Sequence, residues 1–317
     1  MVFEAVARIF IGNMVNLKYG DSPGFNKPNV ALKKCGICDV AERLNIQLTD
    51  FESGKRVEYK EGQYWKEFDV ANGVLEADGI INISKMKAHQ LTRITGAVKN
   101  LFGCIYGLHK AKMHVKIPSA VNFSKLLVDL AMFLKPRLHI MDGIIAMEGN
   151  GPASGTPRKM GVLLLSTDPV ALDSTFCRIV DLDPVFVPTN TYGKTFGLGT
   201  YLEDEIELLG DDIKKFIKKD FSVIRREVKD SALFGFLNPF KRFIVRYPVI
   251  DNKNCTRCGV CVEGCPLDDK GVYFKNGNKK KIPVYNYKKC IRCYCCQEIC
   301  PNNAIYVKTP FLAKLFD

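Results

Sequence analysis

The sequence contains no apolar run approaching the roughly 18 to 20 residues needed to cross a bilayer. Its N-terminus also lacks the basic segment of a secretory signal peptide and has Glu4 there instead. Nor does it have the composition of a disordered or fibrous chain, because 47% of its 317 residues are hydrophobic and 25% are charged. These absences predict a packed cytoplasmic protein, and the length favours two domains.

Cysteine, in contrast, is abundant. Thirteen cysteines without a secretory signal argue against a disulfide framework and favour reduced thiolates that bind metal or carry out redox chemistry. Nine of them lie between Cys255 and Cys300, so a domain boundary is predicted near residue 250. We therefore expect an α/β domain over residues 1–210, a basic and apolar linker over 211–246, a small domain over 247–308 and an apolar tail over 309–317.

The first 210 residues alternate strand-like and helix-like patterns, as in an α/β domain with a mostly parallel, layered sheet. Asp168 is expected to cap a helix that Pro169 opens. The basic clusters between Lys214 and Arg226 predict a further helix in the linker. The pattern predicts strands over 15–19, 46–48, 78–83, 138–147 and 161–166, a hairpin over 56–70, and helices over 2–10, 31–44 and 121–134.

Large apolar side chains recur in two short segments of otherwise charged sequence. Leaving segments this apolar in water is costly. We expect them to pack together, bind a partner or rest on a membrane surface. They are Phe234, Phe236, Leu237 and Phe240 in the linker, and Phe311, Leu312, Leu315 and Phe316 in the tail.

The pattern C-x2-C-x2-C-x3-C-P occurs twice, over residues 255–266 and 290–301. This spacing is typical of 4Fe-4S sites in which the first three cysteines of a run bind one cluster and the fourth binds the other. A pair of zinc knuckles is the alternative, but it fits this spacing poorly. Cys295 lies outside the pattern and is expected to be a packed spare thiol. The expected ligand sets are Cys255, Cys258, Cys261 and Cys300 for the first cluster, and Cys290, Cys293, Cys296 and Cys265 for the second.

The small domain resembles bacterial-type two-cluster ferredoxins, an α+β fold, but has 24 residues between Cys265 and Cys290 that include three consecutive lysines, 279–281.

The charge of the clusters has to be included in the net charge of the protein, which is formally +12 without them. Two oxidised clusters of about −2 each reduce it to about +8, which argues against nucleic acid as a partner. Nucleic-acid binding would need an exposed basic and aromatic face around residues 214–246. The remaining surplus could steer an acidic electron donor.

Five motifs occur in order in the larger domain: GDSPG at 20–24, SKMKAH at 84–89, TGAVKNLFG at 95–103, DGIIAMEGNGP at 142–152 and TDPVALD at 167–173. With them, residues 2–205 resemble the domain of unknown function 362 family. Many members of that family carry a two-cluster ferredoxin module after the main domain. Because members usually begin with a further strand and a Lys-Pro-Asn motif, the resemblance implies that this domain is short at its N-terminus.

Cationic and hydrogen-bonding side chains gather in two of these motifs and just after them. Such groups suit an anionic ligand or a general acid–base pair. The alternative is that the lysines are solvated and the histidines are satisfied structurally. The expected catalytic residues are Lys87, His89, Lys99 and His114, with Asn100 as a ligand-binding residue.

A glycine-rich loop follows the strand predicted over 138–147, and its N–H groups could cradle a phosphate at the carboxyl edge of the sheet. A plain connection is equally compatible, since the loop is neither a P-loop nor a GxGxxG fingerprint. A flavin phosphate would suit it, although no residue demands a flavin. We expect the loop and the lysine–histidine segment to meet at one sheet edge, in a pocket open toward the ferredoxin domain. The predicted ligand-binding residues here are Asp142, Glu148, Gly149, Gly151, Gly155 and Arg158.

Four cysteines precede the small domain. Cys35 and Cys38 form a C-x-x-C pair that is either redox-active or part of an apolar helix. Cys104 and Cys177 are expected to be buried small hydrophobes. Asp173 is expected to face either the core or the cleft.

The leading hypothesis is an iron–sulfur electron-transfer protein, or a ferredoxin-dependent oxidoreductase. It would pass low-potential electrons through two 4Fe-4S clusters to a small anionic substrate or cofactor in the α/β domain. Its partner would be a ferredoxin or a larger redox complex. The alternative is a non-catalytic iron–sulfur binding or assembly subunit that docks to such a complex.

Overall fold

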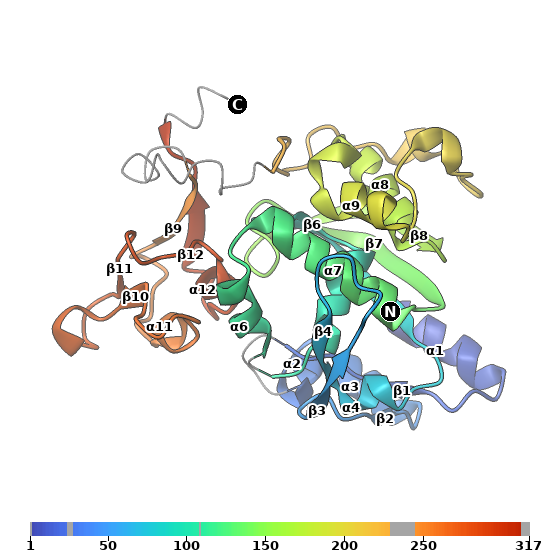
Figure 1. The fold of residues 1–317 in the computed structure, drawn as a ribbon, viewed down its shortest axis with the longest axis horizontal. Coiled ribbons are helices and arrows are strands. Elements are labelled where there is room, and N and C mark those ends of the chain that lie inside the picture. The colour runs from blue at the N-terminus through green and yellow to red at the C-terminus, as the bar shows by residue number, and fades with distance from the viewer. Residues whose placement is uncertain (1, 24–27, 108, 229–244, 312–317) are drawn as a thin grey trace.

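The computed structural model describes residues 2–23, 28–107, 109–228 and 245–311. Figure 1 shows a larger domain with a small C-terminal domain beside it. Within the described ranges, no helix is both long and apolar enough to span a membrane.

The central sheet of the larger domain has four strands in the order β6-β5-β7-β8. Strands β5 (Ile81–His89) and β7 (Leu138–Glu148) are parallel, whereas β6 (Arg93–Thr95) and β8 (Thr156–Ser166) pair antiparallel at the two edges. The sheet is thus mixed, and the mostly parallel sheet predicted from the sequence is not found. The reason is that the glycine-rich loop turns β7 back into β8 as a hairpin, without a crossover helix.

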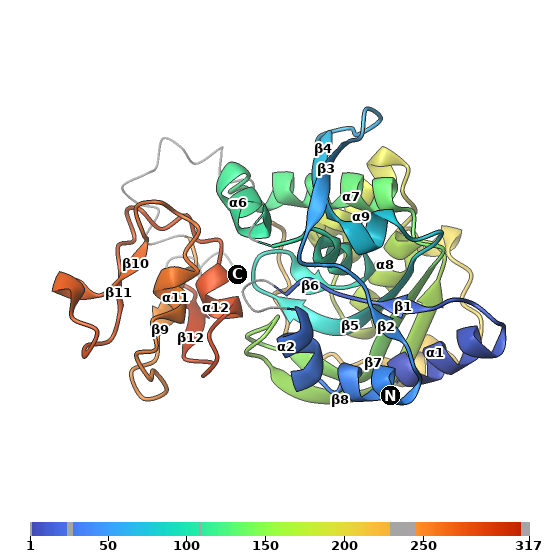
Figure 2. The same cartoon turned by 90° about the horizontal axis from the view of Figure 1, so that it is seen from below.

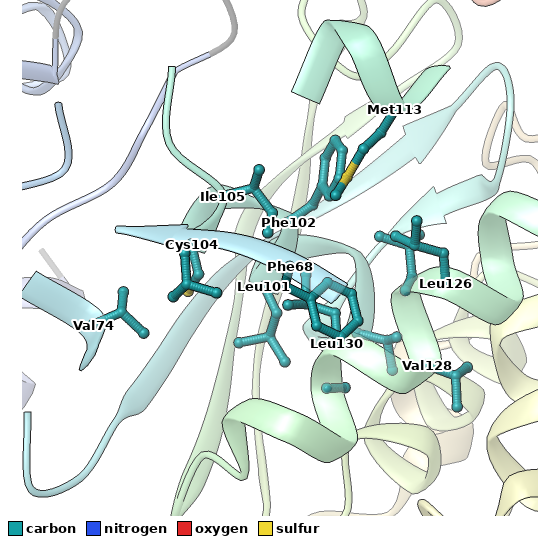
Figure 3. Packing of buried hydrophobic residues seen from close by; sticks show 14 of the residues in the cluster. Phe68, Val74, Leu101, Phe102, Cys104, Ile105, Met113, Leu126, Val128 and Leu130 are labelled. Atoms are coloured by element: carbon teal, nitrogen blue, oxygen red, sulfur yellow. The ribbon is translucent and has the colours of Figure 1, made fainter. Parts of the chain in front are cut away.

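Two apolar clusters form the core of the larger domain. In the first, α7 (Ala120–Leu134) buries Phe123, Leu126 and Leu130 against Phe68 and Leu101, part of which is drawn in Figure 3. In the second, α8 (Pro169–Ile179) packs against Met86 and Met141 of the sheet. Asp168 caps α8 by accepting hydrogen bonds from the N–H groups of Val170 and Ala171, which confirms the predicted cap. Helix α9 (Pro188–Phe196) packs on α7 and α8.

The N-terminal elements complete the larger domain. The predicted hairpin is confirmed as antiparallel β3 (Gly54–Glu58) and β4 (Glu67–Ala71), and β4 contributes Phe68 and Val70 to the first apolar cluster. The single helix predicted over 31–44 is instead two, because Gly36 adopts a left-handed φ of 75° between them. The other elements are α1 (Val2–Gly12), β1 (Lys18–Tyr19), α2 (Pro28–Lys34), α3 (Ile37–Arg43), β2 (Gln47–Leu48) and α4 (Asn72–Leu75).

The described part of the linker, residues 211–228, contains a single 3-10 turn, Ile213–Phe216, where a helix was predicted. Ile213, Phe216, Phe221 and Val223 instead pack into the second apolar cluster, so the chain follows the surface of the domain in an irregular path. Phe311 of the tail is 74% exposed. The other apolar residues of the linker and tail, Phe234, Phe236, Leu237, Phe240, Leu312, Leu315 and Phe316, lie outside the described residues.

The small domain consists of two similar halves. Strand β9 (Tyr247–Ile250) pairs antiparallel with β12 (Ile305–Lys308), and β10 (Val272–Tyr273) pairs antiparallel with β11 (Val284–Tyr285). Two one-turn helices, α11 (Val260–Glu263) and α12 (Cys295–Glu298), follow the first cysteines of the two runs. In both Figure 1 and Figure 2, α12 lies on the side of this domain that faces the larger domain.

Candidate functional site

Two cavities in the small domain are lined by cysteines. Each combines three cysteines of one run with the fourth cysteine of the other, and four thiols around one cavity fit the ligand requirement of a 4Fe-4S cluster. Cys255, Cys258, Cys261 and Cys300 line the first cavity, and Cys265, Cys290, Cys293 and Cys296 line the second. We call these the first and second cysteine sets.

Left-handed backbone turns at equivalent points of the two runs shape these loops. Arg257 and Arg292 both have a φ of 62°, and Gly259 and Tyr294 have φ values of 81° and 64°. Such turns fold a short segment tightly enough for three successive cysteines to face one cavity. Across the described residues, no three His, Cys, Asp or Glu side chains are grouped as ligands for a single metal ion.

The small domain docks onto the larger one through α12 and the glycine-rich loop. Gln297 Nε2 donates to the Asn150 carbonyl oxygen at 2.7 Å, and Asn150 Nδ2 donates to the Ile305 carbonyl oxygen at 3.0 Å. Arg246 donates to Gln90 Oε1 at 2.6 Å, just beyond the end of β5. The second cysteine run is therefore held against the carboxyl end of β5.

A group of basic side chains lies at this junction. Strand β5 places Lys87 and His89 on one face, since they are two residues apart. Helix α5 (Ala97–Asn100) contributes Lys99, and α6 (His109–Lys116) contributes Lys110 and His114. The small domain adds the carboxylate of Glu298, whose Oε1 is 3.4 Å from His89 Nε2. We call the five basic residues the interdomain basic cluster.

Asp21 of the GDSPG motif is the second carboxylate near this cluster. It acts electrostatically on Lys87, Lys99 and Lys110. Its approach depends on Gly103, because a Cβ at that position would be 2.3 Å from Asp21 Oδ1. The first and third motifs of the larger domain thus meet at the same site.

None of the three lysines in the cluster forms an ion pair or hydrogen bond with another described residue. Lys110 is only 8% exposed, and Lys87 and Lys99 are half-buried. The Lys99 ammonium lies 5.0 Å from the ring centroid of Phe102 and 5.9 Å from that of Phe123. A buried ammonium without an anionic partner is costly, so the cluster has unmet capacity for negative charge.

Burial also determines the protonation of these groups. It lowers the pKa of Lys87 and Lys99, and lowers the pKa of Lys110 to about 8 although Asp21 opposes the shift. Burial lowers the pKa of His114 to about 4, and its ring stacks on Phe123 at 4.4 Å. His114 is therefore neutral at pH 7, while Lys110 can gain or lose a proton near that pH.

The tautomer of His89 follows from its contacts. Its Nδ1 accepts hydrogen bonds from the backbone N–H of Leu91 at 3.0 Å and of Thr92 at 3.4 Å, so the proton of the neutral ring is on Nε2. Burial lowers the pKa of His89 and favours this neutral form. Nε2 faces Glu298 but has no partner with hydrogen-bond geometry among the described residues, and the side chain is 1% exposed.

Glu298 is the negative counterpart of the cluster. Burial raises the pKa of its carboxyl group, but the facing His89 and the Lys99 ammonium outweigh this effect and lower the pKa to about 2. The carboxylate is therefore ionised at neutral pH. Glu298 belongs to the second cysteine run and faces His89 of the interdomain basic cluster.

The structure brings together four of the residues predicted from the sequence: Lys87, His89, Lys99 and His114. Asn100 lies beside them, but its Nδ2 donates to Asn82 Oδ1 and to the Ile83 carbonyl, which gives it a structural role. Sequence reasoning missed Asp21, Lys110 and Glu298. Each had a signal in the sequence. Asp21 belongs to the GDSPG motif, Lys110 follows His109, and Glu298 lies between two ligand cysteines.

The carboxylates predicted for the loop side are engaged elsewhere. Asp142 pairs with Lys85 at 2.9 Å. Glu148 accepts a hydrogen bond from the N–H of Ser222, and Arg158 pairs with Asp220 at 2.6 Å. The first contact is internal to the larger domain, and the other two join it to the described part of the linker.

The glycine-rich loop packs against the end of β5, as the predicted convergence requires. A Cβ at Gly151 would be 1.9 Å from the Ala88 carbonyl oxygen, so only glycine allows this approach. Its neighbour Gly149 donates its N–H to the Ser222 carbonyl, and Gly155 packs close to the Glu148 carbonyl. These glycine contacts fix the loop on the larger domain, and Asn150 of the same loop contacts Gln297 and Ile305 of the small domain. This use agrees with the plain connection that the sequence left open, and no described contact supports a flavin at the loop.

The remaining predicted side chains have clear surroundings. Cys35 is exposed, and Cys38 accepts a hydrogen bond from the Tyr19 hydroxyl at 3.6 Å. Cys104 and Cys177 are buried, and burial raises the pKa of Cys104 to about 12. Asp173 faces the core and accepts hydrogen bonds from the N–H groups that open α5, Ala97 and Val98.

Comparison with known proteins gives matches to both domains. Residues 1–178 match the model of a domain of unknown function, DUF362, and residues 247–301 match the model of a 4Fe-4S dicluster domain. A thylakoid-associated protein of Synechocystis sp. is 36% identical over 180 residues, which is 56% of this chain. The match covers 56% of that relative, so the chain spans little more than half of its length. No solved structure matches.

Proposed function

The chain belongs to the domain of unknown function 362 family and carries a 4Fe-4S dicluster domain, and on this basis we propose that it is an iron–sulfur oxidoreductase. In this proposal, low-potential electrons pass from the dicluster domain to a small anionic molecule held by the interdomain basic cluster. The observation that carries it is the set of three lysines with no carboxylate partner, next to the second cysteine run.

The charges of the site favour an anion over a neutral or cationic ligand. Three ammonium groups face two carboxylates, Asp21 and Glu298, while His89 and His114 are neutral. Among its side chains the site therefore carries a surplus of one positive charge in a partly desolvated place. A carboxylate or phosphate group would accept hydrogen bonds from the lysines and from His89 Nε2–H, and such charge-assisted bonds are strong.

The two cysteine sets differ in their exposure and in their link to this site. Cys258 of the first set is exposed, whereas Cys296 of the second set lies in α12, which also carries Glu298. A 4Fe-4S cluster supplies single electrons at low potential. We therefore assign electron entry to the first set and electron exit to the second.

Reduction of an anion also needs protons, and the site can supply them. His89 holds a proton on Nε2, and Lys110, with a pKa lowered to about 8, can release one near neutral pH. Both groups are shielded from water, being 1% and 8% exposed. Lys110 is thus the proposed proton donor, whereas neutral His89 can donate a hydrogen bond through Nε2–H but keeps its proton.

The electron donor in this proposal is an acidic redox protein such as a ferredoxin. An exposed basic loop, with Lys275, Lys279, Lys280 and Lys281, lies between β10 and β11. It ends at Pro283, which lines the first cavity. Exposed Arg257 lies in the ligand loop of the same cavity. Positive charge around the entry point would steer a negative partner toward the first cysteine set.

The test is anion binding to anaerobically purified protein, with inorganic phosphate and succinate as probes and calorimetry as the readout. Lys99→Met should weaken binding about tenfold or more, since a charge-assisted hydrogen bond contributes about 1.5–3 kcal/mol. Its iron content should equal that of the parent protein. Lys85→Met is the matched control, because Lys85 lies on the same strand as Lys87 but pairs with Asp142.

Two results would contradict the proposal. One is equal anion affinity in the parent protein and in Lys99→Met. The other is that neither anion binds and that no small molecule copurifies with the protein. In that second case, stable capture of a larger redox complex would favour a docking subunit.

A further inference from the structure

The two halves of the small domain place different side chains at equivalent points. Ile250 precedes Cys255 by five residues, and Tyr285 precedes Cys290 by the same number. Ile250 ends β9 and lines the first cavity, whereas Tyr285 ends β11 and lines the second. The repeat therefore gives one cavity a hydrocarbon side chain where the other has a hydroxyl group.

The Tyr285 hydroxyl oxygen lies 3.2 Å from the Sγ atom of Cys296, a member of the second set. A cysteine bound to iron is a thiolate and has no proton, so the tyrosine must be the donor once a cluster is bound. The ring is held in place, because it stacks on Tyr287 with centroids 5.5 Å apart and planes at 19°. Tyr287 is fixed in turn by donating to the Pro248 carbonyl at 2.9 Å.

We infer that Tyr285 raises the reduction potential of the cluster held by the second set. This inference rests on the proposed function, because it takes Cys296 to be a cluster ligand. Reduction adds negative charge that spreads onto the thiolate sulfurs. A hydrogen bond to such a sulfur therefore stabilises the reduced form more than the oxidised one.

The first set has no matching side-chain donor at this position. The Ile250 side chain cannot donate a hydrogen bond, and one described donor to a sulfur of that set is a backbone group, the N–H of Ala304 on Cys300 at 3.3 Å. Tyr285 is therefore a positioning residue for the electron. It favours the presence of the electron on the cluster of the second set, which is proposed as the exit toward the interdomain basic cluster. This agrees with the proposed direction of electron flow.

The test is Tyr285→Phe, which removes the hydroxyl and leaves the ring. The anaerobic protein would be titrated with a reductant and followed by electron paramagnetic resonance, with iron and acid-labile sulfide measured on the same samples. We expect unchanged iron and sulfide and a lower midpoint potential for one of the two clusters. A tenfold change in its reduction equilibrium would appear as 59 mV for a one-electron couple.

The control is Tyr306→Phe, because Tyr306 lies on β12 with 43% exposure and should leave both potentials unchanged. If Tyr285→Phe loses iron, fluorination of the Tyr285 ring makes its hydroxyl a stronger donor without changing its place. That variant should raise one potential.

Unchanged potentials, or an equal shift of both, would overturn the inference while leaving the proposed function standing. A parent protein with zinc and no acid-labile sulfide would instead overturn the proposed function, and this inference with it.

Discussion

Lys110→Met should stabilise the anion-free protein at neutral pH, which is the opposite of what removing a buried residue usually does. Lys110 is 8% exposed, and burial lowers its pKa from 10.5 to about 8. A depression of about 2.5 pKa units corresponds to a cost of about 3 kcal/mol for keeping the ammonium charged in the folded state. Methionine retains the aliphatic length of the side chain without the charge.

The stability difference between Lys110→Met and the parent protein should depend on pH. Below about pH 8 the ammonium is charged in both the folded and the unfolded state, so the parent protein bears the full cost. As the pH rises from about 8 to 10.5, the folded protein releases the Lys110 proton first and the cost disappears. The stability advantage of Lys110→Met should therefore be largest at pH 7 and vanish near pH 10.5.

Thermal unfolding of anaerobic protein between pH 7 and 10.5 would measure this difference. Lys112→Met is the control, since Lys112 is exposed on the same helix and its loss should change stability by less than about 0.5 kcal/mol. Added phosphate should narrow the gap between the parent protein and Lys110→Met by stabilising the parent more. Equal effects of the two substitutions, or an advantage that stays constant across this pH range, would refute the idea of an unpaired buried ammonium.

Three further predictions address other parts of the molecule. Cys258→Ala and Cys293→Ala should each remove one cluster signal in electron paramagnetic resonance, and two variants that lose the same signal would contradict the division into two sets. Asp168→Ala should lower the free energy of unfolding by about 1–2 kcal/mol in denaturant titration, because its carboxylate accepts from the N–H groups of Val170, Ala171 and Thr200, whereas Asp168→Asn should lose less. Gln297→Ala should make residues 245–311 easier to release by limited proteolysis, since its amide joins α12 to Asn150, and unaltered cleavage would count against this docking contact.

The sequence was most informative where spacing alone determines chemistry. The two cysteine runs predicted which thiols share a cavity, including the exchange of the fourth cysteine, because the repeat leaves few ways to surround two clusters. The Asp168 cap and the hairpin over β3 and β4 were also predictable, since both depend on neighbouring residues.

Features that depend on contacts between distant segments could not be predicted in this way. A mostly parallel sheet was predicted instead of the mixed one, because the glycine-rich loop is compatible with either a hairpin or a crossover. Glu298 was missed because it belongs to the other domain, and only docking brings it to His89. Asp142, Glu148 and Arg158 looked available in the sequence, but Lys85 engages the first and the linker engages the other two.

The central claim is that an anion binds beside the second cysteine set and exchanges electrons with the cluster held there. Its most direct test is a redox titration of the anaerobic protein, followed by electron paramagnetic resonance, with and without saturating phosphate. Negative charge near one cluster disfavours its reduction, so one midpoint potential should fall when phosphate binds while the other stays constant. The same phosphate should have no effect on Lys99→Met. Two potentials that ignore the anion, or that shift together in both proteins, would contradict the account.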